Sequence, residues 1–106
     1  MIGEGSVQYA VTAFWSAVAY KVPVTFLVLR NEEYAILKWF AEMEGAHGAP
    51  GLDLPALESS AIASAYGMKS QRVDRPDDLR DRLGAAFESS EPELLEIRVA
   101  PGMALF

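Results

Sequence analysis

The chain has no cysteine, a single histidine and no long hydrophobic run. Without cysteine it can form no disulfide and can use no thiolate as a nucleophile or metal ligand. The histidine, His47, lies in a stretch rich in glycine, alanine and proline, which favours an exposed loop position over a role in a triad. The longest mainly apolar run, residues 22–29, falls far short of the ~20 residues that cross a bilayer.

Positive charge is also scarce. The 106 residues include 9 Lys and Arg against 15 Asp and Glu, which gives a net charge of −6. Nucleic acids and anionic membranes recruit basic patches, so neither is expected as a partner. The N-terminus has no basic segment followed by an apolar core, so no secretion signal is expected and a cytoplasmic location is predicted.

Hydrophobic residues make up 51% of the chain, enough for the core of one modest domain. Their spacing predicts helices at 7–20, 34–44, 59–66 and 76–87, and strands at 22–29, 70–73 and 93–99. The first helix is apolar nearly all round, so we expect it to be buried on most sides. Gly67 is expected at the end of the third helix, and Asp74 as the cap of the fourth.

Alternating helices and strands predict a parallel α/β sheet with right-handed crossovers. A turn at Gly3 should follow a strand, yet only Met1 and Ile2 precede it. Three further strands make a narrow sheet for such apolar helices. The predicted fold is therefore an incomplete α/β/α three-layer domain that occupies residues 1–106, with a long loop at 45–55.

The first turn carries a possible phosphate site. Gly3 and Gly5 flank Glu4, and Ser6 precedes the apolar helical pattern as a predicted N-cap. The N–H groups at such a helix start favour phosphate. A carboxylate among phosphate oxygens requires a cation between them, so the turn predicts a metal–phosphate site. An ordinary strand–turn–helix with a capping serine is the simpler alternative.

A second polar turn, at residues 30–34, follows the strand at 22–29. In a parallel sheet both turns lie at the carboxyl ends of the strands, where ligands gather. Glu4 and Asn31 can therefore face one point. A carboxylate, an amide oxygen and a nearby main-chain carbonyl form a ligand set that suits Mg²⁺, which keeps its other positions for water and phosphate.

The pattern of Gly3, Glu4, Gly5 and Ser6 followed by Asn31 resembles the Gly-Asp-Gly…Asn motif of thiamine-diphosphate-dependent enzymes. The resemblance covers essentially the whole chain and corresponds to the later part of the C-terminal, diphosphate-binding domain. Within the family it is nearest to the benzoylformate decarboxylases, on these segments: Tyr9, 13–15, Tyr20, Pro23, Tyr34, Leu37, 39–41, 50–55 and 63–67.

The resemblance implies thiamine diphosphate and Mg²⁺ as cofactors. It assigns Glu4, the Asn31 side chain and the Glu33 main-chain oxygen to the metal, and the following residues to the diphosphate: Gly3, Gly5, Ser6, Glu33 and Tyr34. It places Ile36, Leu37 and Phe40 near the substrate, although core packing on an amphipathic helix explains these three equally well. No residue matches the acid–base groups of the family, so no catalytic residue is assigned.

The implied activity is decarboxylation of a 2-keto acid such as benzoylformate. The cofactor in this family binds between two domains, so the pyrimidine-binding domain of the parent enzyme or of another subunit is an implied partner, and the chain alone is expected to be inactive. Exposed apolar surface on helices 7–20 and 34–44 predicts a homo-oligomer.

Three positions differ from the family pattern. Glu4 stands where Asp is usual, Arg30 replaces the first residue of an Asn-Asn pair, and Glu32 stands where a small residue is common. Acetolactate synthase-like and oxalyl-CoA decarboxylase-like enzymes share the metal motif and remain alternatives. Two further alternatives are an NADP-binding domain, with Arg30 reading a 2′-phosphate, and a non-catalytic α/β interaction module. The dinucleotide fingerprint lacks its third glycine, since Gln8 stands there.

Overall fold

The computed structural model describes residues 1–102. Its strands are β1 (Ile2–Gly3), β2 (Thr25–Arg30), β3 (Lys69–Val73) and β4 (Glu93–Arg98), and its helices are α1 (Glu4–Val7), α2 (Ala13–Ala19), α3 (Ala35–Met43), α4 (Ser59–Ala65) and α5 (Pro76–Glu88). The strands form one parallel sheet in the order β1-β2-β4-β3. The predicted parallel α/β fold is therefore confirmed, and the short strand before Glu4 makes the sheet four-stranded.

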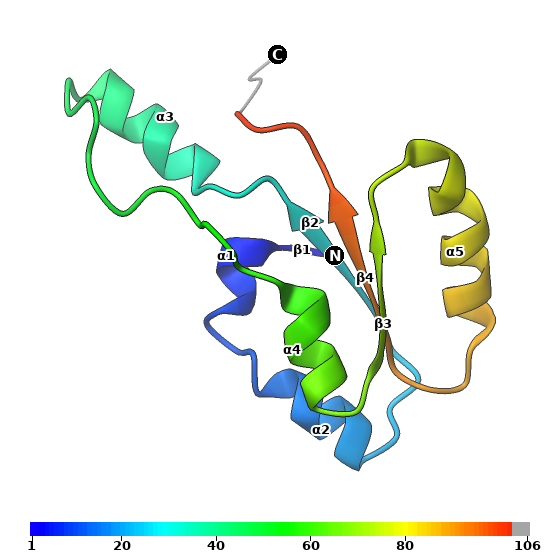
Figure 1. Ribbon diagram of the computed structural model, residues 1–106. Helices are drawn as coiled ribbons and strands as arrows, with labels where there is room; N and C mark the ends of the chain where they lie inside the picture. The colour runs from blue at the N-terminus through cyan, green and yellow to red at the C-terminus, as the bar shows by residue number, and fades with distance from the viewer. Residues whose placement is uncertain (103–106) are drawn as a thin grey trace.

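The helices cover both faces of the sheet, as Figure 1 shows: α1, α2 and α4 lie on one side and α5 lies on the other. Side chains along each strand point alternately to the two faces of the sheet, so each face has its own core. On β4, Leu94 packs with Val28 beneath α1, α2 and α4, whereas Leu95 packs with Val73 and Ala86 beneath α5. The sheet is thus the middle layer of three.

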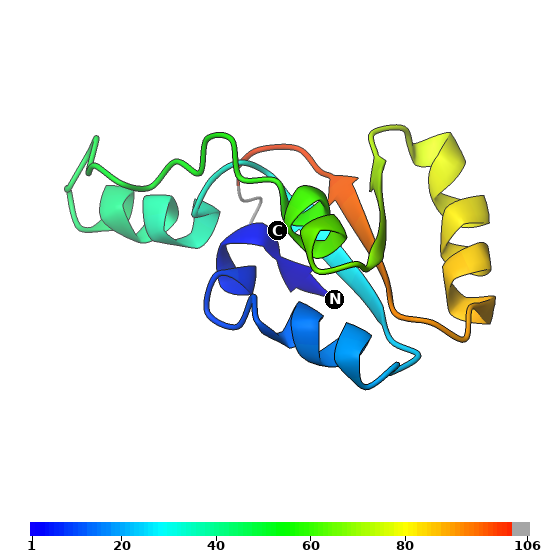
Figure 2. The same cartoon turned by 60° about the horizontal axis from the view of Figure 1, so that its bottom comes forward.

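Helix α3 does not join either core. None of its residues is buried, and Figure 2 shows the helix and the loop after it extending to one side of the sheet. The radius of gyration is 15.2 Å, larger than the ~13 Å expected of a compact domain of this length. The molecule is therefore a compact body with a projecting arm, residues 35–54.

The predicted helix at 7–20 is wrong in its extent. It is divided into α1 and α2, and the main chain between them makes turn bonds of the i→i−3 kind, from Tyr9 to Ser6 (3.2 Å) and from Ala10 to Val7 (3.1 Å). Thr12 and Val11 are β-branched and weaken a continuous helix here. The predicted burial is also wrong, because α2 buries only Phe14 and Ala17.

Two predicted caps are corrected as well. Ser6 does not cap a helix, because α1 already begins at Glu4 with Gly3 in the capping position. Asp74 does not cap α5, because Pro76 fits the first helical position and places Arg75 at the N-cap. The prediction for Gly67 is confirmed: its φ is +89°, and the N–H groups of Gly67 and Met68 donate to carbonyls at the end of α4 (2.9 and 3.0 Å).

Strand β2 begins at Thr25 rather than at residue 22, because Pro23 has no N–H to donate to the sheet. The loop predicted at 45–55 is confirmed as the connection between α3 and α4. In the part of the chain described, the helices are too short or too polar to span a membrane.

Candidate functional site

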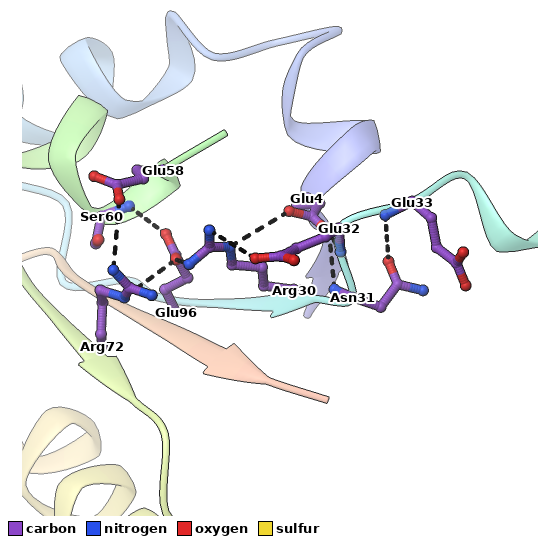
Figure 3. Close-up of polar contacts among 9 residues, drawn as sticks. All are labelled: Glu4, Arg30, Asn31, Glu32, Glu33, Glu58, Ser60, Arg72 and Glu96. Carbon is purple, nitrogen blue, oxygen red and sulfur yellow. Dashed lines mark hydrogen bonds and ion pairs between the residues drawn. The ribbon is translucent and has the colours of Figure 1, made fainter. Parts of the chain in front are cut away.

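The two polar turns meet at the carboxyl ends of β1 and β2. Ile2 pairs with Val28 and Gly3 with Leu29, so the residues that follow, Glu4 and Arg30–Glu32, leave the sheet side by side. Figure 3 shows Glu4 directed at the turn after β2. The predicted convergence of Glu4 and Asn31 is thereby confirmed.

The Glu4 carboxylate is the centre of this arrangement. Its side chain is buried, and Oε1 accepts the main-chain N–H groups of Asn31 (2.8 Å) and of Glu32. Glu32 adopts a left-handed conformation, φ +63°, which turns two successive N–H groups toward one oxygen. Burial raises the pKa of the Glu4 carboxyl, while these N–H groups and the charge of Arg30 oppose that rise.

The Asn31 side chain completes a group of polar atoms. One terminal position of its amide lies 2.9 Å from the Glu33 main-chain oxygen and 3.2 Å from Glu4 Oε1. With nitrogen at this position, the amide donates to both oxygens. With oxygen at this position, it accepts the Glu33 N–H at 3.4 Å and also faces the Glu33 main-chain oxygen and Glu4 Oε1, a group of oxygens that a cation would stabilise.

These spacings are ordinary N–H···O hydrogen-bond distances, and neighbouring oxygens around Mg²⁺ are also ~2.9 Å apart, because Mg–O distances are ~2.0–2.1 Å. Glu4 Oε2 is also buried without a hydrogen bond. The donor set of one carboxylate, one amide and one carbonyl therefore fits a small divalent cation. In residues 1–102, no group of three or more His, Cys, Asp or Glu side chains forms a metal site of another kind.

The residues expected around the diphosphate lie close by. Gly3 ends β1, and Gly5 and Ser6 lie in the first turn of α1, where helical N–H groups have no partner in the helix itself. A Cβ on Gly5 would collide with the Tyr34 ring. Tyr34 is placed differently from the expectation in one respect, because its N–H donates to the Leu52 carbonyl (2.8 Å).

The side chain of Glu33 has a second role that the sequence did not reveal. Glu33 Oε2 accepts from Lys38 Nζ at 2.7 Å, and the same ammonium lies 2.5 Å from Asp53 Oδ1. The Lys38 hydrogen bond and the Gly102 N–H lower the pKa of Glu33. We call Glu33, Lys38 and Asp53 the clip, because together they tie the start of α3 to its returning loop.

The three residues expected near a substrate lie on the projecting arm. Ile36, Leu37 and Phe40 are 42%, 47% and 49% exposed. Core packing, the alternative for these residues, does not occur within the described part of the chain. Their exposure leaves them free to face a ligand or another polypeptide surface.

A row of charges, buried at one end and exposed at the other, also escaped sequence reasoning. It runs across the sheet in strand order, from Glu4 after β1, through Arg30 on β2 and Glu96 on β4, to Arg72 on β3 and Glu58 before α4 (Figure 3). We call these five residues the charge row. The available signal was Glu96, a carboxylate inside the apolar strand 94–97.

Arg30 is part of this row and is therefore not free to read a 2′-phosphate, as the NADP alternative requires. It is 8% exposed, and its guanidinium lies 3.3 Å from Glu96 Oε1 and 3.0 Å from Glu32 Oε1. The fold and the turn after β1 instead define a thiamine diphosphate-binding domain of the class found at the C-terminus of such enzymes.

Comparison with known proteins supports the same class. The sequence profile of the thiamine pyrophosphate enzyme C-terminal TPP-binding domain matches residues 1–97. The chain belongs to this family.

Among curated proteins, benzoylformate decarboxylase of Pseudomonas aeruginosa is 40% identical over 97 residues, covering 92% of this chain and 18% of that protein. A putative acetolactate synthase large subunit, IlvX of Mycobacterium tuberculosis, is 31% identical over 104 residues, covering 91% of this chain and 20% of that protein. The chain thus spans about a fifth of the length of these curated relatives.

Solved structures show the same likeness. Benzoylformate decarboxylase from Polynucleobacter necessarius superposes with a TM-score of 0.93 at 36% identity, covering 99% of this chain and 20% of that one. A thiamine diphosphate-dependent 4-hydroxybenzoylformate decarboxylase from Rhodococcus jostii RHA1 superposes with a TM-score of 0.92 at 32% identity, covering 97% and 20%.

Proposed function

We propose that this chain supplies the Mg²⁺- and diphosphate-binding half of a thiamine diphosphate-dependent 2-keto acid decarboxylase of the benzoylformate type. The observation that carries the proposal is the meeting of the Glu4 carboxylate, the Asn31 amide and the Glu33 carbonyl at spacings of 2.9 and 3.2 Å. Glu4, Asn31 and the Glu33 main-chain oxygen would hold the metal, and the turn at Gly5 and Ser6 would receive the diphosphate.

Each partner has a separate task. Glu4, Asn31 and the Glu33 main-chain oxygen would hold the metal, whose charge would offset that of the diphosphate. The bound cofactor would supply the electron sink for loss of CO₂, while the protein binds and orients it. Glu4 must be ionised to serve as a ligand. Burial opposes that form and raises the pKa of Glu4, while the two N–H groups on Oε1 and the charge of Arg30 offset part of this cost.

Binding of the cofactor is tested by calorimetric titration of the chain with thiamine diphosphate in the presence and absence of Mg²⁺. We expect binding that requires the metal. Glu4→Gln keeps the size of the side chain but removes its charge, so it should weaken this binding at least about tenfold, as removal of a supporting metal-site residue commonly does. Binding of NADP⁺ in place of thiamine diphosphate would contradict the proposal.

The substrate is assigned to the aryl 2-keto acids because the arm carries Ile36, Leu37 and Phe40 in exposed positions next to the metal-binding turn. The test is a chimera in which this chain replaces the matching segment of the Pseudomonas aeruginosa enzyme. Release of CO₂ from benzoylformate is the expected result, and preference for pyruvate would favour the second candidate below.

An acetolactate synthase-like activity is the second candidate, because a putative large subunit of that enzyme is 31% identical to this chain. The same chimera separates the two candidates, since acetolactate formed from pyruvate can be measured beside CO₂ formed from benzoylformate. Acetolactate as the main product would replace the decarboxylase assignment.

A further proposal concerns partners. The apolar residues of α3, Trp15 of α2 and Tyr20 directly after α2 are exposed and need a covering surface. We assign that surface to a second copy of the chain or to a pyrimidine-binding domain. Sedimentation equilibrium of the chain tests self-association, and a monomer at all concentrations would leave the pyrimidine-binding domain as the partner.

A further inference from the structure

Arg30, the last residue of β2, lies beside the proposed metal ligand Glu4 and also forms an ion pair with Glu32 of the following turn at 3.0 Å. Its Nε lies 3.9 Å from Glu4 Oε2, and its guanidinium also contacts Glu96 at 3.3 Å. The Arg30 side chain is 10% exposed, and those of Glu4 and Glu96 are 1% and 2% exposed. Three charged side chains are thus packed together with little access to water.

The two oxygens of the Glu4 carboxylate have different surroundings. Oε1 faces the turn, where it accepts two N–H groups and lies near the Asn31 amide. Oε2 lies 3.9 Å from Arg30 Nε, beyond hydrogen-bond distance, and neither atom has a hydrogen-bond partner in the described part of the chain. A cation between Glu4 and Asn31 therefore meets Oε1 first, while Oε2 is attracted to the Arg30 charge.

Resting on the metal site proposed above, we infer that Arg30 is a positioning residue that keeps Glu4 a one-oxygen ligand and thereby sets the preference of the site for Mg²⁺ over Ca²⁺. The physical reason is the difference between the two ions. Mg²⁺ needs six ligands in a near-ideal octahedron, whereas Ca²⁺ takes six to eight and readily accepts both oxygens of one carboxylate. With Oε2 kept beside Arg30, Glu4 cannot bind the metal ion through both carboxylate oxygens.

The rest of the charge row keeps Arg30 in place. Its partner Glu96 accepts the Ser60 main-chain N–H at 2.7 Å and lies 3.8 Å from Arg72 Nε. Glu96 also stands opposite Val28 in the sheet register, which fixes its backbone next to the strand that carries Arg30. Arg30 is therefore anchored from β4 and cannot follow Glu4 if the carboxylate rotates toward a metal.

The test uses the double variant Arg30→Met/Glu96→Gln, which removes one positive and one negative charge. Binding of Mn²⁺ to the full chain is followed by the electron paramagnetic resonance of the free ion, and Mg²⁺ and Ca²⁺ are then titrated as competitors. We expect the ratio of Ca²⁺ to Mg²⁺ affinity to rise roughly tenfold in the variant, because Glu4 can then present both oxygens. A general loss of structure would lower both affinities and leave their ratio unchanged.

The matched control is Arg72→Met/Glu58→Gln. It also removes one positive and one negative charge, but from the Arg72–Glu58 pair at the far end of the charge row. These two side chains lie 3.5 Å apart and do not touch Glu4. This control should keep the parent ratio, as should Arg30→Lys, which retains the charge beside Oε2. If the circular dichroism of the first variant differs from that of the parent, Arg30→Gln is measured instead, and a smaller rise is expected.

An unchanged ratio in Arg30→Met/Glu96→Gln, or in Arg30→Gln where that variant replaces it, overturns the inference and leaves the proposed metal site standing. An equal rise in the Arg72 control does the same. Failure of the parent chain to bind Mn²⁺ at all overturns the metal site itself, and the inference falls with it. The two failures are distinguishable because only the second is visible in the unaltered protein.

Discussion

The body of the molecule and its projecting arm differ in which side chains they bury. In the body, charged side chains such as Glu4 and Glu96 are buried deeply and are stabilised by partners from neighbouring strands. In the arm, apolar side chains such as Leu37 and Phe40 remain about half exposed. The body packs its apolar side chains into two cores, although Trp15 and Tyr20 stay exposed, whereas no side chain of α3 is buried.

The turn proposed to bind the metal lies at the junction of the two regions. Asn31 and Glu32 donate to Glu4 in the body, and Tyr34 leads directly into α3. A change in the position of the arm is therefore transmitted to the turn through only a few residues. The following four predictions probe this contrast, from the largest expected effect to the smallest.

The largest effect is expected from Glu96→Ala in the body. It leaves the buried Arg30 guanidinium and the Ser60 N–H without their partner, and breaking a buried pair in this way lowers the free energy of unfolding by ~3–5 kcal/mol. Urea unfolding followed by circular dichroism measures the loss. Arg75→Ala removes an exposed ion pair in which Arg75 lies 3.8 Å from Asp77. It should change the free energy of unfolding by less than about 0.5 kcal/mol.

Two leucines compare the regions directly. Leu94→Ala, in the fully buried core of the body, should lower the free energy of unfolding by ~2–5 kcal/mol, because a cavity is left behind. Leu37→Ala, on the arm, should change it by no more than about 0.5 kcal/mol, because this side chain is 47% exposed. Similar losses in the two variants would show that α3 is packed in solution and would remove the contrast.

Two glycines test the junction. An alanine at Gly5 would strike the Tyr34 ring and approach Leu54 Cδ1 at 3.2 Å, so Gly5→Ala should lower the free energy of unfolding by ~1–3 kcal/mol. Gly3→Ala meets nothing within 4 Å and should cost less than about 0.5 kcal/mol. Near-ultraviolet circular dichroism should show a changed tyrosine signal only for Gly5→Ala. Equal effects of the two changes would mean that Tyr34 moves aside freely.

The smallest effect concerns the clip and its dependence on pH. Because the pKa of Glu33 is lowered in the folded state, the unfolded state takes up a proton first as the pH falls, and the stability supplied by the clip disappears through the acid range. That stability is fully present above the pKa of ~4.5 expected for the unfolded chain.

Urea unfolding at a series of pH values from ~7 to ~3 measures this loss. Glu33→Gln should flatten the acid limb of the profile, and Lys38→Met should do the same because the two groups are partners at 2.7 Å. A flattening by only one of the two changes would contradict the role of the pair.

The sequence allowed much of the fold to be predicted because its signals are local. The apolar run ending at Leu29, the glycine that closes α4 and the alternation of elements all act through neighbouring residues, and each is confirmed. The prediction of one helix at 7–20 failed because it was based on composition. The path of the chain there is decided instead by a few i→i−3 hydrogen bonds. Likewise, the cap expected at Ser6 depended on a helix start that lies three residues earlier.

The meeting of Glu4 and Asn31 could also be predicted, because parallel strands bring their carboxyl ends to one edge whatever the details of packing. Arg30 and Glu96 could not be paired in advance. They are 66 residues apart, and they touch because β4 lies between β2 and β3 in the sheet. Strand order follows from how whole elements pack, so it cannot be predicted from a local sequence pattern.

By itself, then, the sequence determined the element types, the metal-binding motif and the family it resembles, since these depend on residue spacing along the chain. Only the tertiary structure decided which charge stands behind the proposed metal ligand, and that the arm carrying Leu37 and Phe40 projects from the body. The physical reason is that burial and ion pairing depend on distance in space, and strands remote in sequence set those distances.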